Sequence, residues 1–408
     1  MIPLEDALAS YANTLRPLAP ETLSTLRALG AVLAAPALAQ TDLPRFAQSA
    51  LDGYALRSAD VAAATREHPV HLPVALQVAA SAQAVQPELP SHSAARIFTG
   101  AMMPRGADAM IAQERAQLIE GVLTFTAPFA AGRNVRARAE ELAKGTVLAE
   151  AGSRIGPGLL ASLVNAEVAT VSVHRRPRIK VFVTGDEVRP AGSPLKPGEI
   201  HDSNGPLIAA LLRSWGYEAP VAEHLPDEPE AVRAALAQAF EDADLVISAG
   251  GASVGDKDYL PAAAESLGVK RIFWKVAQKP GKPMFFGVRE DGAQQRVMLA
   301  LPGNPGAVLI GMVLHARLLL SQLDGQRQPD LGWTSGVLDL AVERDSERAR
   351  LVRMSLRHDQ GVARLNPLPL QDSHMLSNLG RADVLVWIEA GSEVVAAGSV
   401  LRWIALPE

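Results

Sequence analysis

The sequence contains no cysteine and few aromatic residues, and each absence excludes a class of structure. Cysteine is absent, and Phe, Trp and Tyr make up 4% of the 408 residues. Disulfides and thiolate metal sites are therefore impossible. The hydrophobic fraction is 48%, so the cores must be built largely from Ala, Leu and Val. A chain of this length is long enough for roughly two to four domains.

The sequence also lacks a charge excess and a long apolar run. Lys and Arg number 39 against 44 Asp and Glu, a net charge of −5. This balance argues against a general nucleic-acid or membrane-surface binder. The longest apolar run, 306–314, is shorter than the roughly 20 residues that span a bilayer, and residues 1–7 lack the features of a signal peptide. We expect a cytoplasmic protein with no nucleic-acid or membrane partner, in which local positive charge holds any anionic ligand.

The first part of the chain divides into blocks of different character. Residues 4–15 and 21–38 have apolar spacing compatible with helices. Residues 41–141 contain short strand-like segments separated by turn residues, which predicts a β-rich domain. Residues 142–176 are again an apolar mixture. We expect them to form one discontinuous unit with residues 1–40, into which the β-rich domain is inserted.

The second part of the chain predicts an α/β domain followed by a β domain. Residues 177–325 alternate between strand-like and helix-like segments, which is typical of a doubly wound parallel sheet. The expected strands are 179–184, 245–248, 271–276 and 297–301, and the expected helices are 206–215, 230–240, 260–267 and 307–323. In residues 326–408 apolar and polar residues again alternate with a period of two, which indicates β-strands. The expected fold class is multidomain α/β plus β, with an inserted β-rich domain and a C-terminal barrel-like β domain.

Three glycines follow the expected strand at 245–248. Gly250, Gly251 and Gly255 are interleaved with Ser253, and Asp256 and Asp258 come next. Glycines allow consecutive N–H groups to point at an anion, and nearby carboxylates suit a metal ion. A tight turn between strand and helix, with surface acids, would show the same residues.

Two further polar segments follow expected strands of the same sheet. Thr184, Gly185, Asp186 and Glu187 leave the carboxyl end of the first strand, where ligands bind in such sheets. Acids at a helix entry are the alternative. The segment 302–305 links a later strand to a helix whose free N–H groups and dipole favour anions. Its two prolines also make it a good structural turn.

A lysine-bearing segment lies between those strands. Lys275, Lys279 and Lys282 are interrupted by Pro280 and Pro283, which prevent a regular helix. A stiff loop of this kind can hold phosphate or another oxyanion beside the glycines. A surface hairpin with solvated lysines is the alternative.

The β-rich block offers two weaker signals. Asp52 lies in an Asp-Gly turn, and Thr99 follows an expected strand. Such turns are common in loops without function. Residues 132–141 combine three arginines with two acids, which suits either a salt-bridged surface loop or a clamp over an anionic substrate.

Taken together, these stretches resemble the molybdopterin molybdenumtransferases, the MoeA-type family that includes the E domain of gephyrin. The matching sequence motifs occur in the same order as in the family, over nearly the whole chain. They are Ser-Ala-Leu-Asp-Gly-Tyr-Ala at 49, Phe-Thr-Gly-Ala at 98, Thr-Gly-Asp-Glu at 184, His-Asp-Ser-Asn at 201, Ser-Ala-Gly-Gly-Ala-Ser-Val-Gly-Asp-Lys-Asp-Tyr at 248, Lys-Pro-Gly-Lys-Pro at 279, Leu-Pro-Gly-Asn-Pro at 301 and Asp-Ser-His-Met-Leu-Ser at 372.

The resemblance implies an activity and its partners. Family members insert molybdenum from molybdate into adenylated molybdopterin and release AMP, and Mg²⁺ is the expected divalent ion. The resemblance also implies an elongated homodimer with shared active sites, in which Asp52 and Thr99 act on the partner's α/β domain. Transient contact with molybdoenzyme maturation proteins is a further implied partnership.

The same resemblance assigns roles to individual residues. The implied catalytic residues are Glu187, Asp258, Asp52, Thr99, Lys275 and Lys279. The implied cofactor-binding residues are Thr184, Gly185, Asp186, Ser248, Gly250, Gly251, Ser253, Gly255, Lys282, Pro302, Asn304 and Pro305. The implied metal ligands are Glu187, Asp258 and Asp227.

Some positions depart from the family pattern. Ala139 and Glu141 stand where Gly and Asp are usual, and Asp372 stands where Gly is usual. The stretch 349–356 lacks the usual Gly-Arg pair. These departures concern substrate gating and the C-terminal contribution. A non-catalytic molybdopterin carrier on the same scaffold is the alternative function, although Glu187, Asp258 and the three lysines are retained.

Overall fold

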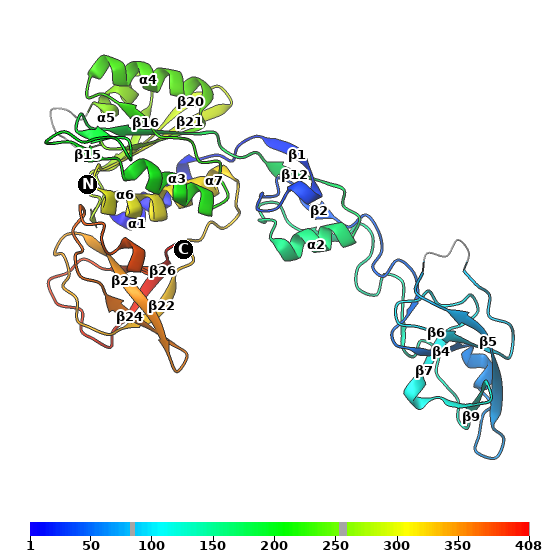
Figure 1. Ribbon diagram of the computed structural model, residues 1–408. Coiled ribbons are helices and arrows are strands. Elements are labelled where there is room, and N and C mark those ends of the chain that lie inside the picture. Colours follow the sequence, from blue (N-terminus) through cyan, green and yellow to red (C-terminus); the bar gives the residue numbers. More distant parts are fainter. Residues whose placement is uncertain (82–85, 253–258, 408) are drawn as a thin grey trace.

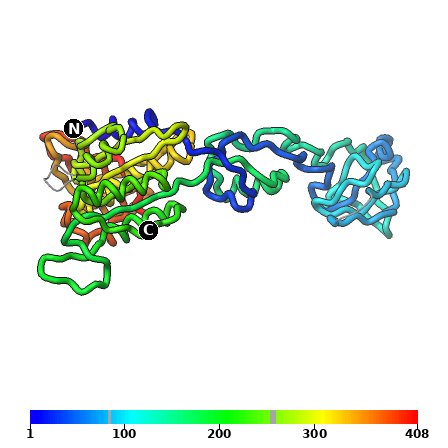
Figure 2. Tube along the Cα trace, turned by 90° about the horizontal axis from the view of Figure 1, so that it is seen from above, coloured from blue at the N-terminus to red at the C-terminus, as the bar shows by residue number. Residues whose placement is uncertain are grey.

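The computed structural model describes residues 1–81, 86–252 and 259–407. The molecule is elongated (Figure 1). An α/β domain and a C-terminal β domain lie together at one end, a β-rich domain lies at the other, and a small unit lies between them. A view turned by 90° shows the same three-part arrangement (Figure 2).

The α/β domain is built on a six-stranded mixed sheet. The strand order is β16-β13-β17-β21-β20-β18. The four parallel strands are β16 (Glu223–Leu225), β13 (Ile179–Thr184), β17 (Leu245–Ala249) and β21 (Gln294–Leu301). The antiparallel strands are β20 (Phe285–Asp291) and β18 (Lys270–Trp274). The sequence did not predict β20 as a separate strand. The sheet nevertheless brings the carboxyl ends of all four parallel strands to one edge.

Helices cover both faces of this sheet, as expected for a doubly wound domain. The core on one face includes residues of α1 (Leu4–Thr14), α3 (Asn204–Ser214), α6 (Pro305–Ile310) and α7 (Arg317–Leu323). The core on the other face includes residues of α4 (Pro229–Asp242) and α5 (Leu260–Ser266). Between α6 and α7 the helix continues as a π-helical segment, Gly311–Ala316. The N-terminal helix α1 therefore packs on the α/β domain through Leu4, Ala7 and Tyr11.

The helical rod from Pro305 to Leu323 is the one described helix that is long and apolar enough to cross a membrane. However, 78% of its most apolar stretch lies inside the protein. This degree of burial is typical of a helix in the core of a protein.

The middle unit pairs segments that are far apart in sequence. β1 (Pro20–Ser24) pairs with β12 (Thr170–His174), and β2 (Ala37–Leu38) pairs with β11 (Val147–Ala149). α2 (Pro157–Asn165) packs against these pairs. The helix predicted over 21–38 is wrong. Gly30, at φ +76°, and Pro36 interrupt the segment, and only a 3₁₀ turn at Thr25–Arg27 is helical. The exact domain limits stay a prediction.

The β-rich domain contains a six-stranded sheet and a short strand pair. The sheet order is β7-β4-β6-β5-β9-β8. Its strands are β4 (Gly53–Leu56), β5 (Val70–Val78), β6 (Ala94–Ile97), β7 (Ala109–Ala112), β8 (Gln117–Ile119) and β9 (Val122–Phe125). β3 (Gln48–Ser49) pairs with β10 (Val135–Arg136). Short 3₁₀ turns lie at Ser58–Val61 and Gln113–Arg115.

The C-terminal domain is a closed five-stranded barrel. Its strands are β22 (Thr334–Leu338), β23 (Ala349–Asp359), β24 (Val362–Pro367), β25 (Val384–Ile388) and β26 (Val400–Ala405), with a 3₁₀ turn at Leu379–Arg381. Pairing of β25 with β23 closes the barrel. β19 (Gln278–Lys279), from the lysine-bearing segment, adds a parallel pairing to β23. The barrel is thus joined by backbone hydrogen bonds to the α/β domain.

Candidate functional site

The predicted ligand-binding segments lie side by side at the carboxyl edge of the α/β sheet. Val183 is in register with Ala249, and Ala249 is in register with Leu301. The backbone N–H of Gly250 also donates to the carbonyl of Leu301, at 3.0 Å. The turns that follow β13, β17 and β21 therefore meet, as the sequence predicted from the strand order of open α/β sheets.

The first two glycines after β17 are required by close packing. Gly250 has φ +96°, and a Cβ there would lie 2.3 Å from Thr184 Oγ1. Gly251 has φ +67°, and a Cβ there would lie 2.5 Å from Leu260 Cδ1. Any other residue would need both a strained φ and a displaced neighbour. Ser248 is fully buried, with its hydroxyl 3.5 Å from the Gly250 carbonyl, so it lies beneath this turn.

Three predicted residues of this turn, Ser253, Gly255 and Asp258, lie outside the described residues. Their predicted roles stay predictions.

The turn after β13 is linked to the turn after β16. The N–H of Asp186 donates to Asp227 Oδ2 at 3.4 Å, and the N–H of Asp227 donates to Asp186 Oδ1 at 3.3 Å. His224 Nε2 lies 2.8 Å from the carbonyl of Gly185. These contacts place the predicted acids together at one side of the glycine turn. Glu187 is exposed next to them.

Two hollows open along this edge and share part of their walls. One, of about 520 Å³, is lined by Thr184, Glu187 and Gly251 among others. The second, of about 530 Å³, is lined by Lys279 and Lys282 and by residues of the barrel. Both hollows are also lined by Pro283, Pro302, Asn304 and His374. The two hollows therefore adjoin, and together they are called the cleft between the α/β domain and the barrel.

The three predicted lysines are not equivalent in this cleft. Lys279 and Lys282 line the second hollow, whereas Lys275 is absent from the described walls of both hollows. The Lys275 ammonium instead lies 5.2 Å from the centre of the Trp274 ring. Trp274 Nε1 donates to the carbonyl of Ala252, at 2.9 Å. Lys275 is thereby held near the end of the glycine turn.

Lys279 is paired with an acid of the barrel. Its Nζ lies 3.3 Å from Asp345 Oδ2. Hydrogen bonds from Arg348, the backbone N–H of Glu347 and Lys279 hold the pKa of the Asp345 carboxyl well below its ordinary value, against the effect of desolvation. Asp345 is therefore ionised across the ordinary pH range and holds the Lys279 ammonium in an ion pair.

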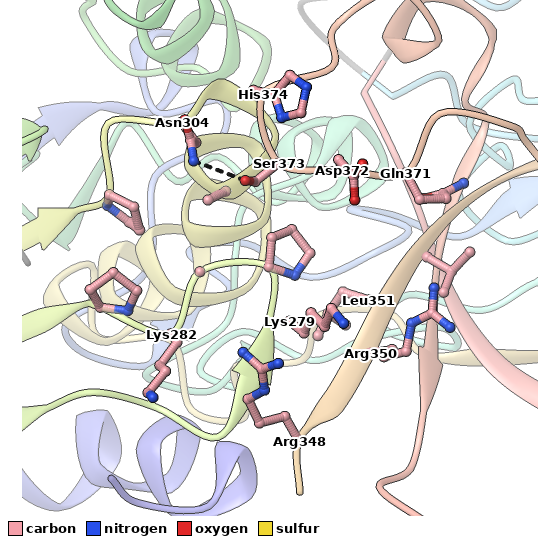
Figure 3. Close-up of a pocket in the computed structure, with 16 residues that line it drawn as sticks. Lys279, Lys282, Asn304, Arg348, Arg350, Leu351, Gln371, Asp372, Ser373 and His374 are labelled. Carbon is pink, nitrogen blue, oxygen red and sulfur yellow. Dashed lines mark hydrogen bonds between the residues drawn. The ribbon is translucent and has the colours of Figure 1, made fainter. Parts of the chain in front are cut away.

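The barrel contributes cationic residues that sequence reasoning missed. Arg348 and Arg350 line the same hollow as Lys279 and Lys282 (Figure 3). They flank Ala349, which is in register with Gln278. The available signal was the Arg-Ala-Arg word at the start of an expected strand, where alternate residues share a face. Four cationic side chains therefore line a cleft in a protein whose net charge is −5.

A loop of the barrel closes the cleft near the 302–305 turn. Asn304 Nδ2 donates to Ser373 Oγ at 2.9 Å (Figure 3). The N–H of Gly306 donates to the carbonyl of Ser373 at 2.8 Å. Asp372, one of the departures from the family pattern, lines the cleft on this loop. Its carboxylate adds negative charge opposite the lysines.

The buried guanidinium of Arg353 shapes this loop. Arg353 is 2% exposed, and it donates to the carbonyls of Met375 and Leu370, both at 2.8 Å. Desolvation lowers its pKa, and the nearby Asp372 carboxylate opposes that shift. Because Arg353 binds backbone carbonyls on both sides of Ser373, it fixes the loop conformation.

The structure brings Asp52 and Thr99 together in the β-rich domain. Asp52 Oδ1 accepts from the N–H of Thr99 at 2.8 Å and from its hydroxyl at 2.7 Å. These two hydrogen bonds lower the pKa of the Asp52 carboxyl, and the charge of Arg96 adds to the effect. The β-rich domain that carries this pair lies at the opposite end of the molecule from the α/β domain and the barrel (Figure 1).

The arginine-rich segment 132–141 lies beside the same domain. Arg138 Nε lies 2.5 Å from Asp42 Oδ2, and Arg133 lies over the ring of Phe129. Ala139, which stands where the family has Gly, adopts φ +59°. Such a φ is unfavourable for any residue with a Cβ. The departure noted in the sequence is therefore a point of backbone strain.

We expect Ala139→Gly to raise the free energy of unfolding of the β-rich domain by about 1 kcal/mol. The substitution relieves the positive φ without removing a hydrogen bond. Urea unfolding followed by hydrogen exchange of this domain measures the change. Ala137→Gly is the matched control, because Ala137 does not have a positive φ. It should lose stability, and equal effects of the two substitutions would contradict the strain argument.

The described carboxylates are compatible with a substrate-held Mg²⁺. Among the described residues, no group of three or more His, Asp or Glu is arranged to enclose a metal ion. Mg²⁺ commonly keeps several waters and is bound by one or two carboxylates plus phosphate oxygens. Glu187, in the cleft wall, and Asp227, beside Asp186, supply carboxylates of that kind.

Three family models match the chain in succession. They are described as the MoeA N-terminal region (domain I and II), over residues 2–167, a probable molybdopterin binding domain, over 180–322, and the MoeA C-terminal region (domain IV), over 335–406. A protein of Nostoc sp. named molybdopterin molybdenumtransferase is 33% identical over 95% of this chain and 89% of its own. The chain belongs to the molybdopterin molybdenumtransferase family.

Further members agree over the full length. The molybdopterin molybdenumtransferase of Haemophilus influenzae is 32% identical, with 98% of each chain covered. The crystal structure of the molybdopterin biosynthesis MoeA protein of Pyrococcus horikoshii superposes with a TM-score of 0.82, at 28% identity and 99% coverage of both chains. These molybdenumtransferase relatives confirm the resemblance that the sequence motifs indicated. They also confirm the predicted fold class.

Proposed function

We propose that the chain inserts molybdenum from molybdate into adenylated molybdopterin, with release of AMP. Family membership makes the chain a molybdopterin molybdenumtransferase, an enzyme of molybdenum cofactor biosynthesis. One observation supports the finer proposal most strongly. The cleft joins a glycine turn and acids on the α/β side to four cations on the other side, so it offers separate surfaces for a pterin phosphate and for a second anion.

The cations of the cleft offset the charge of the two substrates. Molybdate and adenylated molybdopterin are both anions and repel each other in water. Lys279, Lys282, Arg348 and Arg350 reduce this repulsion where the two meet. Lys275 lies over the Trp274 ring and supplies positive charge near the end of the glycine turn. In the turns after β17 and β21, Gly251, Gly303 and Asn304 carry backbone N–H groups that can donate to phosphate oxygens.

The acids at the other side of the cleft orient water and metal. Glu187 is exposed in the cleft wall, so it can position the water that attacks the adenylate bond. Glu187 and Asp227 would hold Mg²⁺ together with substrate phosphates, and Asp258 is a further ligand from the sequence comparison. Bound Mg²⁺ would neutralise developing phosphate charge.

We infer that the enzyme is a homodimer with shared sites. Asp52 and Thr99 form a defined pair, yet they lie at the far end of their own chain from the cleft. The pair therefore reaches a cleft only in a second copy. The sites are completed in this way by a C₂ dimer, in which each chain's β-rich domain meets its partner's α/β domain.

The remaining partnerships follow from the proposed reaction. A cytoplasmic location fits an enzyme whose substrates are soluble metabolites. Transient contact with molybdoenzyme maturation proteins would pass on the product. The charge balance argues against a general nucleic-acid or membrane-surface partner.

The deciding experiment is an assay of AMP release from adenylated molybdopterin by the purified protein with Mg²⁺. We expect release that depends on molybdate and leaves molybdenum on the pterin. Tight pterin binding without AMP release would instead identify a carrier. In that case the Ala139 and Asp372 departures become the first positions to revert.

A further inference from the structure

The turn that carries Lys279 and Lys282 is held from inside by the side chain of Gln278. Gln278 is fully buried although its backbone belongs to β19. Its Nε2 donates to the carbonyl of Gly281, at 3.2 Å. This bond closes the turn between the two lysines. Gly281 has φ +96°, and a Cβ there would lie 2.6 Å from Gln278 Nε2, so only glycine allows the approach.

A buried histidine holds the other end of the same amide. His315 Nε2 lies 2.8 Å from Gln278 Oε1. His315 Nδ1 lies 2.9 Å from the hydroxyl of Tyr11 on α1. Tyr11 and His315 are both fully buried. A continuous chain of hydrogen bonds therefore runs from the N-terminal helix through the domain core to the lysine turn.

The donors and acceptors along this chain have one consistent assignment. The amide must donate through Nε2 to the Gly281 carbonyl, so its Oε1 must accept from His315. His315 then carries its proton on Nε2 and accepts from the Tyr11 hydroxyl at Nδ1. Burial lowers the pKa of His315 to about 3, so the ring stays neutral. The assignment leaves each of these buried groups paired.

Other bonds hold the two arms of the segment and the Lys279 end of the turn, and the Gln278 amide adds the bond that bridges the turn at Gly281. The N–H of Val276 donates to the carbonyl of Lys282 at 2.9 Å, and the N–H of Ala349 donates to the carbonyl of Ala277 at 3.0 Å. His315 lies in the π-helical segment of the rod. Single π turns are frequent at functional sites, because they redirect a side chain that a regular helix would present elsewhere.

We propose that Gln278 is a positioning residue for Lys279 and Lys282, and that His315 fixes the orientation of the Gln278 amide. The effect on catalysis rests on the proposed function, in which these lysines bind the anionic substrates. The effect on the conformation of the turn does not depend on the proposed function. Without the Gln278 bond, the Gly281 carbonyl loses its buried partner and the turn that carries the two lysines becomes less rigid.

The test compares four variants by hydrogen exchange of residues 277–284 in the full-length protein. Gln278→Met and His315→Leu should each speed exchange there about tenfold, as expected for the loss of a buried hydrogen bond. His315→Gln keeps an N–H donor for Gln278 and should restore most of the protection. Val313→Ala, a cavity substitution in the same rod at a buried apolar residue, is the stability control and should leave this segment protected.

Steady-state kinetics supply the second readout. We expect Gln278→Met to raise KM for adenylated molybdopterin about tenfold with little change in kcat. Exchange in Gln278→Met that matches Val313→Ala overturns the positioning role. Faster exchange with an unchanged KM overturns its link to substrate binding. If the wild-type protein releases no AMP, the proposed function fails while the exchange experiment still decides the positioning role.

Discussion

Asp52→Asn should lower molybdate-dependent AMP release at least about 100-fold, the size expected when a positioned acid or base is lost. The carboxylate is held by both hydrogen-bonding groups of Thr99, and these bonds keep its pKa below the ordinary value. Asparagine has a similar shape but no charge. The measurement is the initial rate of AMP formation, with Glu120→Gln, an exposed acid of the same domain, as control.

Mixing two inactive variants tests whether Asp52 acts across the dimer. Asp52→Asn and Glu187→Gln should each be inactive alone. In a mixed dimer one cleft receives both substitutions and the other receives neither. Random mixing of equal amounts should therefore recover about a quarter of the wild-type activity. A mixture as inactive as its components, with mixed dimers present by mass spectrometry, would contradict the shared site.

Asp244→Asn should lower the free energy of unfolding of the α/β domain by about 3–5 kcal/mol, because it leaves buried charges unpaired. Asp244 is 1% exposed and accepts two hydrogen bonds from Arg175, at 2.6 and 2.8 Å. Its Oδ1 also lies 3.2 Å from Nη1 of the buried Arg296. This cluster ties the start of β17 to residues 175–178, where the chain enters the domain from the middle unit.

The same carboxylate predicts a pH dependence of stability. Burial alone would raise the pKa of Asp244, but the hydrogen bonds from Arg175 and Arg178 outweigh burial and lower the pKa to about 2. A pKa that is lower in the folded state stabilises the protein above the unfolded value of 3.8. About 2 kcal/mol should therefore be lost as the pH falls from about 4 to about 2.

Urea unfolding followed by tryptophan fluorescence measures both effects. All five tryptophans lie at or beyond Trp215, so their signal reports the α/β domain and the barrel. Asp359→Asn, at an exposed acid, should leave the midpoint and its pH dependence unchanged. If Asp244→Asn kept the wild-type loss of stability in acid, the assignment of that loss to Asp244 would be wrong.

The turns of the α/β site could be predicted because each depends on local signals. An apolar strand followed by glycine or proline is recognisable in the sequence, and parallel strands bring such turns to one edge. Thr184, Gly250 and Asn304 lie at or next to the ends of such strands, at this edge of the sheet. The helix expected over 21–38 failed because pairing with residues 147–174 overrides local spacing.

The cationic wall from the barrel could not be predicted in the same way. Arg348 and Arg350 reach the cleft because β19 pairs with β23, and this pairing joins segments about 70 residues apart in the chain. The local Arg-Ala-Arg pattern shows that the two arginines share a face, but it does not show that this face lines a cleft. The hydrogen-bonded series of Tyr11, His315 and Gln278 could not be predicted either, because its members come from three distant segments.

The interleaved connectivity also determines the order in which the units can fold as the chain leaves the ribosome. The β-rich domain is complete when residue 141 has emerged, whereas β1 must wait for its partner β12, which ends at His174. The first helix, α1, waits longest, since its Tyr11 pairs with His315. Helix α1 therefore docks after the β-rich domain that follows it in the chain, and a nascent chain arrested before the helix at 305–323 still exposes the apolar face of α1.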